Sequence, residues 1–172
     1  GETQRAIEIQ KKTISIYKSK PLDSVYTSQK RKALLVDLYS ELSGSFLKIE
    51  QADSAKHYAK IISTLITPKD SCNQRTLLKV RAEIYFFEKK YSQAKKNFKA
   101  ASKLCDPNLP IIDLRMKYAL GKSAHGEGNF KEAKNTLQQG LDDYNVKPSE
   151  EGYMSDYYML LADSYKETGN LE

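Results

Sequence analysis

The chain has 172 residues, of which 40% are apolar and 29% charged, with 8 Gly, 5 Pro and no Trp. This composition excludes collagenous and disordered chains, and no apolar run approaches the roughly 18 residues that a membrane span needs. A metal site or a redox cluster with several ligands would have to use nearly all of the two His and two Cys. We therefore expect no enzyme, no metal and no cofactor.

The charge is spread unevenly along the chain. The net charge is +6, from 28 basic and 22 acidic residues. Residues 1–34 carry 8 basic and 3 acidic groups, residues 75–104 carry 9 and 2, and residues 141–172 carry 2 and 8. A nucleic-acid-binding protein would combine a basic stretch with a recognisable binding motif, which is missing here. We interpret the lysines as a solvated face and expect no direct contact with nucleic acid.

The first expected element is a helix over residues 3–18, where apolar residues recur at helical spacing. Together with the linker that follows, it makes up an N-terminal segment over residues 1–35. We interpret this segment as a cap or as a degenerate repeat, whose helix packs on the first complete unit.

Three alanines then repeat at a constant spacing, since Ala55, Ala94 and Ala133 are each 39 residues apart. Nine positions before these alanines lie Phe46, Tyr85 and Ala124, so the first two units have a large residue there and the third has an alanine. Because a repeat of this length indicates stacked helical units, we divide the chain accordingly. The units are residues 36–70, 71–109 and 110–148, followed by residues 149–172 as the first helix of a fourth unit.

Each unit is predicted to be two amphipathic helices joined by a tight turn. In the second unit, Leu77 and Ala82 belong to one apolar stripe, and Ala94 and Phe98 belong to another. The prolines fall between units, where a helix must end: Pro68, Pro107, Pro110 and Pro148. No segment alternates β-branched residues as a strand would. The expected fold is therefore all-α, with about eight helices in antiparallel hairpins.

These residues resemble the tetratricopeptide repeat (TPR) family. The third unit carries the best match, with Leu120-Gly121, Gly128-Asn129-Phe130 and Ala133. The sequence departs from the family pattern at Arg81 and Lys117, where the family has apolar residues, and its period exceeds the family's 34 residues by five. The resemblance covers about residues 36–172 and implies a right-handed superhelical α-solenoid whose first helices line a concave groove.

The resemblance also implies which residues face the groove and what they bind. Transferred position by position, the groove residues are Thr76, Lys79, Glu83, Phe86, Arg115, Tyr118, Lys122, His125, Asp156, Met159 and Asp163. This surface is basic in the middle and suits a protein or peptide partner with an acidic segment. Glu83 stands where the carboxylate-clamping members of the family have Asn, which argues against a receptor for chaperone tails.

The family implies a binding function within a larger protein. The array resembles the TPR input regions of bacterial signalling and transcription regulators, and the alternative is an architectural adaptor that assembles a complex. The sequence stops where the fourth hairpin should turn, so we expect an excised piece of a longer chain. An exposed apolar face around Leu161 and Tyr165 would then permit self-association.

Two cysteines flank the second hairpin. Cys72 precedes its first helix and Cys105 follows its second, so antiparallel helices would bring the two ends level. A disulfide between them would indicate an oxidising compartment such as a periplasm, whereas the default localisation is cytoplasmic. The alternative is two free thiols, because packed helix axes lie 8 to 10 Å apart and a disulfide needs Cα atoms within about 7 Å.

The sequence contains no complete catalytic motif. Gly121-Lys122-Ser123 resembles the end of a phosphate-binding loop, but Met116 occupies the place of the required glycine and no strand precedes it. His57 and His125 lie in different units, which a repeat array keeps apart. We expect neither histidine to act as a metal ligand or a general base.

Overall fold

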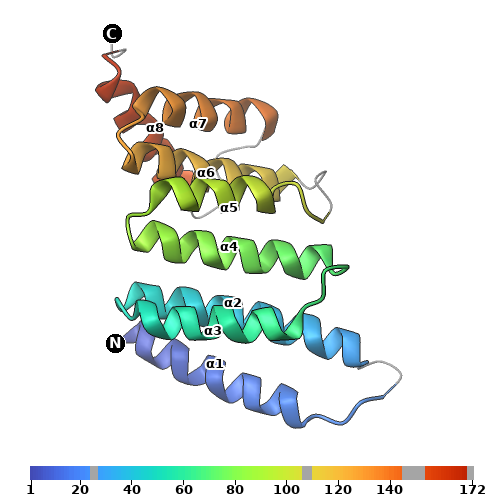
Figure 1. Ribbon diagram of the computed structural model, residues 1–172. Coiled ribbons are helices and arrows are strands. Elements are labelled where there is room, and N and C mark those ends of the chain that lie inside the picture. Colours follow the sequence, from blue (N-terminus) through green and yellow to red (C-terminus); the bar gives the residue numbers. More distant parts are fainter. Residues whose placement is uncertain (24–26, 106–109, 145–153, 170–172) are drawn as a thin grey trace.

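The computed structural model describes residues 1–23, 27–105, 110–144 and 154–169 (Figure 1). Within these residues the chain forms helices and no strand, which confirms the all-α prediction. The helices are α1 (Glu2–Ser19), α2 (Ser28–Lys48), α3 (Ala52–Leu65), α4 (Ser71–Phe87), α5 (Tyr91–Ala101), α6 (Pro110–Gly126), α7 (Phe130–Tyr144) and α8 (Met154–Glu167). Pro107, Pro148 and residues 170–172, for which the sequence predicts linkers and a turn, lie outside the described residues.

The helices stack in chain order as antiparallel hairpins (Figure 1). The hairpins are α2 with α3, α4 with α5, and α6 with α7, and each one packs against the next. At one end α1 packs on α2, and at the other end α8 packs on α7 and contacts α6. Pro110 is the first residue of α6, a position that tolerates proline because the first N–H groups of a helix have no partner within it.

Small residues allow the two helices of each hairpin to approach closely. On the second helices these residues are fully buried, and they are the repeated alanines Ala55, Ala94 and Ala133. In the first hairpin the Ser43 hydroxyl donates to the Ala55 carbonyl oxygen across 3.2 Å. In the third, a Cβ atom on Gly121 would lie 2.6 Å from Cγ of Leu137, so a larger residue would force the helices apart. The 39-residue spacing therefore marks the crossing points.

The turns of the three hairpins share one backbone conformation. Glu50, Lys89 and Gly128, again 39 residues apart, have φ of 60°, 59° and 78°. The N–H group of the following residue donates to the carbonyl oxygen five residues earlier at 2.8 to 2.9 Å, in the pairs Gln51 to Phe46, Lys90 to Tyr85 and Asn129 to Ala124. This is the helix-ending arrangement that favours glycine, and two of the three hairpins adopt it without one.

An ion pair between neighbouring hairpins also repeats with the 39-residue period. Lys56 on α3 pairs with Glu88 at the end of α4, with 2.6 Å between Nζ and Oε1. One period later, Lys95 on α5 pairs with Glu127 at the end of α6 at 2.5 Å. The Ser92 hydroxyl donates to the same Glu127 carboxylate at 2.9 Å. Each pair fastens the second helix of one hairpin to the turn of the next.

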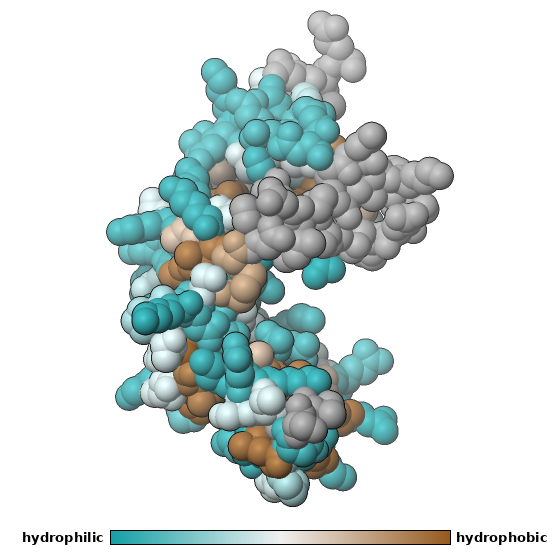
Figure 2. Space-filling model, turned by 90° about the vertical axis from the view of Figure 1, so that its right-hand side faces the viewer, coloured by the Kyte–Doolittle hydropathy of each residue, from teal (hydrophilic) through white to brown (hydrophobic). Residues whose placement is uncertain are grey.

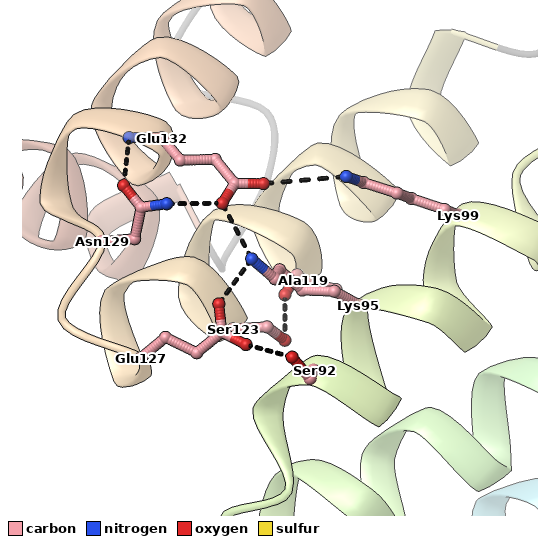
Figure 3. A network of polar contacts seen from close by, with 8 residues as sticks. All are labelled: Ser92, Lys95, Lys99, Ala119, Ser123, Glu127, Asn129 and Glu132. Carbon is pink, nitrogen blue, oxygen red and sulfur yellow. Dashed lines mark hydrogen bonds and ion pairs between the residues drawn. The ribbon is translucent and has the colours of Figure 1, made fainter.

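The second of these junctions is extended by Glu132 on α7 into a network (Figure 3). The Glu132 carboxylate lies 2.8 Å from Nζ of Lys95 and 3.7 Å from Nζ of Lys99. Asn129 accepts a hydrogen bond from the Glu132 N–H and donates one to its carboxylate. Burial disfavours the Lys95 ammonium, but its hydrogen bonds to Glu127 and Glu132 outweigh this effect and raise its pKa. The same bond to Lys95 lowers the pKa of Glu127.

A disulfide joins the start and the end of the second hairpin. Cys72, in the first turn of α4, is bonded to Cys105, and their Cα atoms lie 4.5 Å apart. The α5 helix ends at Ala101, so Cys105 lies beyond it in a turn with φ of 65°. The axis-to-axis spacing of packed helices therefore does not limit the distance between these two residues.

The prediction of an exposed apolar face around Leu161 and Tyr165 on the last helix is wrong. Leu161 is only 7% exposed, because it packs with Leu137 and Tyr157 in a buried cluster. Tyr165 is half-buried against the same cluster. In the array, this face of α8 is the one that covers α7.

No helix among the described residues combines the length and the apolar character required to cross a membrane.

Candidate peptide-binding groove

The first helices of the hairpins form one side of the array. Here α2 packs directly on α4, and α6 contacts α8, whereas among the described residues the second helices α3, α5 and α7 do not pack on one another in this way. Helices on the inner side of a curved stack approach each other most closely, which favours the expectation that the first helices line the concave side. In the view of Figure 2, hydrophilic residues make up most of the coloured surface.

At the α2 to α4 step the groove side carries charged groups that offset one another. Lys79 and Glu83 on α4 form an ion pair with 3.7 Å between Nζ and Oε1. Burial raises the pKa of Glu83, and Lys79 opposes the rise. Burial likewise raises the pKa of Asp37 on α2, again against the effect of Lys79. Lys79 therefore interacts with two carboxylates of its own chain.

At the α4 to α6 step a lysine lies between two aromatic rings. Nζ of Lys122 lies 5.0 Å from the ring centroid of Phe86 on α4 and 5.9 Å from that of Tyr118, one turn earlier on α6. Both distances are within the range of a cation–π contact. Lys122 is exposed, and among the described residues no carboxylate pairs with it. The arrangement therefore offers a positive charge flanked by apolar surface.

At the α6 to α8 step the aromatic row continues. The Tyr118 ring stacks on that of Tyr157, with 5.5 Å between centroids, and the Tyr157 hydroxyl donates to the Leu137 carbonyl oxygen at 2.7 Å. Burial raises the pKa of Tyr118, and the Asp156 carboxylate on α8 raises it further. Asp156 directly precedes Tyr157 on α8 and is exposed. Met159 follows it on α8 and is 59% exposed.

One of the expected groove residues, His125, packs at the end of its hairpin. The His125 ring meets the Phe130 ring edge-on at 4.9 Å, within its own hairpin. Phe86 and Tyr91 make the same contact one period earlier, at 5.4 Å. Phe86 also reaches Lys122, whereas no described residue gives Nε2 of His125 a hydrogen-bond partner.

The remaining expected residues line the same helices. Thr76 donates its hydroxyl to the Cys72 carbonyl oxygen at 3.4 Å, and Arg115 and Asp163 are exposed on α6 and α8. Asp37 and Tyr157 also lie on these helices, and the sequence pattern did not predict them as groove residues. Asp37 lies one 39-residue period before Thr76, so extending the pattern back to the first unit would have found it.

The described residues contain no cluster of three or more His, Cys, Asp and Glu side chains that could hold a metal ion. His57 on α3 instead meets the ring of Tyr58 edge-on at 5.2 Å.

No protein-family model and no curated protein matches this sequence. Similar solved structures include the nearly identical TPR-like repeats of a Podosopora anserina protein described as a kinesin light chain, at 18% identity and a TM-score of 0.56. That match covers 98% of this chain and 80% of the other, and a point variant of the same protein gives a TM-score of 0.57. MamA from AMB-1 is 17% identical, with a TM-score of 0.52 over 99% of this chain and 91% of its own. The chain therefore has the fold of a TPR-like α-solenoid.

Proposed function

We propose that this array is a protein-interaction module that binds a peptide segment of a partner along its first helices. The observation that carries the proposal is Lys122, held over the rings of Phe86 and Tyr118 with no carboxylate of the described chain paired to it. An exposed charge with aromatic neighbours suits recognition of a carboxylate that has an apolar residue next to it.

The neighbouring charges favour this position over others on the same side. Lys79 already interacts with Glu83 and Asp37, so a ligand carboxylate there would compete with groups of the chain itself. Lys122 has no such competitor among the described residues. The acidic segment that we propose for the partner would therefore meet α6.

The context that we propose is a larger bacterial regulatory or signalling protein, because the array resembles the input regions of such proteins. An architectural adaptor that assembles a complex is the alternative. The sequence that follows residue 172 in the parent gene distinguishes them: a membrane span and an output domain support the regulator, and further repeats support the adaptor.

A peptide-selection experiment tests the binding function. A displayed library of random 12-residue peptides is selected on the wild-type chain, and affinities are measured by fluorescence anisotropy. We expect Lys122→Glu with Tyr118→Ala to weaken binding at least tenfold. The charge-matched control changes one exposed lysine on α7, Lys131→Glu, and should alter binding less than twofold. Equal losses in both variants would show general electrostatic attraction and contradict the proposal.

A further inference from the structure

We propose that the α6 to α8 part of the groove recognises a mixed-charge sequence, in which an acidic residue meets Lys122 and a Lys or Arg three residues away meets α8. This inference rests on the proposed function and specifies its ligand. It adds a requirement for a basic residue to the acidic segment discussed above.

The exposed side of α8 presents two acids and a thioether. Asp156, Met159 and Asp163 lie at positions i, i+3 and i+7, which share one face of a helix. Both carboxylates are exposed, and among the described residues neither pairs with a cation. The stack of Tyr157 on Tyr118 places α8 beside the aromatic row on α6.

This combination fits a long cationic side chain. The methylene groups of a Lys or Arg can lie along the exposed Met159 side chain while the charged end reaches a carboxylate. Asp156 and Asp163 are separated by about 10 Å along the helix, at 1.5 Å per residue, with Met159 between them. A cation on Met159 can therefore approach either acid, whereas an acidic ligand side chain would be repelled by both.

The spacing of the two ligand charges follows from the packing of the helices. The Tyr118 ring on α6 stacks on the Tyr157 ring on α8, and helices in packing contact have axes about 8 to 10 Å apart. An extended peptide advances about 3.3 Å per residue, so three residues cross from one helix to the next. An acidic residue at Lys122 thus places the residue three positions away over Met159. The residues between them pass the stacked rings of Tyr118 and Tyr157.

Four synthetic peptides of ten residues, labelled with a fluorophore, test this charge order. They share one Leu and carry Glu-x-x-Lys, Lys-x-x-Glu, Glu-x-x-Glu or Lys-x-x-Lys at their centre, where x is Ala or Leu. We expect one of the two mixed peptides to bind at least fivefold more tightly than either like-charged peptide. Both mixed orders are needed because the direction of the bound peptide is one of the results.

Charge reversal on the protein gives the decisive comparison. Asp156→Lys with Asp163→Lys should invert the preference, so that Glu-x-x-Glu becomes the tightest of the four peptides. Lys122→Glu should shift the preference toward Lys-x-x-Lys. Circular dichroism checks that each variant keeps its helices. Unchanged peptide preference in the α8 variant would overturn the inference.

A third variant separates this inference from the proposed function. Phe86→Ala with Tyr118→Ala removes the aromatic walls and keeps every charge of the groove. Loss of binding in this variant, together with insensitivity to the α8 reversal, leaves the groove function standing and overturns the charge order. Binding of no peptide, or binding that this variant does not change, contradicts both.

Discussion

The two halves of the array are held together differently. In the first half, α1, α2, α3 and α4 share one continuous apolar core that includes Ile14, Leu42, Ile62 and Val80. In the second half, the described buried residues fall into two separate clusters. One surrounds Phe98, and the other contains Leu137 and Tyr157. The polar network of Lys95 bridges α5 to α6 and α7 at this point.

Both halves also carry ion pairs, since Lys56 pairs with Glu88 in the first half as Lys95 pairs with Glu127 in the second. In the first half the ion pair adds to a continuous apolar core, whereas in the second half Lys95 joins α5 to α6 and α7 where the apolar clusters are separate. Lys122, Tyr118 and Met159 therefore lie in the half whose cohesion depends more on ion pairs, which acid can break.

Ile62→Ala should have the largest effect, because it opens a cavity in the continuous core of the first half. Ile62 is fully buried. Removing three buried carbons typically lowers the free energy of unfolding by about 2 to 5 kcal/mol. Urea denaturation followed by circular dichroism measures this loss, with the exposed Ile9→Ala on α1 as control. A loss below about 1 kcal/mol for Ile62→Ala would contradict the assignment of the core.

Replacing both cysteines by serine should have the next largest effect. The bond closes a loop with a sequence separation of 33 residues, for which the chain-entropy relation gives a loss of about 3 to 4 kcal/mol. The unfolding free energies of the oxidised wild type and of Cys72→Ser with Cys105→Ser give the difference. Mass analysis under non-reducing conditions reports the bond directly, and two free thiols in protein from an oxidising compartment would contradict it.

Glu127→Gln should weaken the junction in the second half by about 1 to 2 kcal/mol at pH 7, because it removes the charge that Lys95 meets. The folded chain lowers the pKa of Glu127 from the ordinary value of 4.5, so the stabilisation is present above that value. It disappears as the pH falls through the lowered folded pKa.

Thermal unfolding of wild type and Glu127→Gln across pH 3 to 7 measures this dependence. Glu88→Gln, at the corresponding position one junction earlier, is the matched comparison, since Lys56 lowers the pKa of Glu88 in the same way. Lys95 is the less exposed of the two lysines, so the loss should be larger for Glu127. A difference between wild type and Glu127→Gln that does not shrink as the pH is lowered below 4.5 would be inconsistent with an ionic origin.

Gly128→Ala should have the smallest effect, about 1 kcal/mol of destabilisation, because its φ of 78° is unfavourable for a residue with a Cβ atom. No neighbouring atom obstructs a Cβ there, so the cost reports the backbone alone. Lys89→Gly, at the same turn position of the second hairpin, should change stability by less than this. Equal destabilisation by both changes would argue against a common turn.

Much of the fold is predictable from the sequence because the repeat fixes it. The alanine spacing predicts the crossing points of the hairpins, and Gly128-Asn129 predicts the turn of the third. The turns at Glu50 and Lys89 have no glycine to predict them. There the packing of the neighbouring helices imposes a positive φ that the residue itself disfavours. The same tertiary effect buries Leu161, which the sequence alone leaves uncovered.

The sequence predicts which helix positions share the groove face better than it predicts which side chains meet there. The 39-residue period places Lys122 and Tyr118 on the same helix face, but the proximity of Phe86 to Lys122 depends on how two hairpins pack. His125 has the same register as Phe86, and its ring turns to Phe130. Side-chain direction at a hairpin end depends on local packing, which spacing does not encode.

The most direct test of groove binding uses the three methionines of the chain as methyl NMR probes. Met159 is exposed on the groove side of α8, whereas Met116 and Met154 are buried. Titration with a selected peptide should shift the Met159 methyl signal strongly and leave that of Met154 nearly unchanged. A peptide that binds with wild-type affinity and leaves the Met159 signal in place would contradict binding across the first helices from α6 to α8.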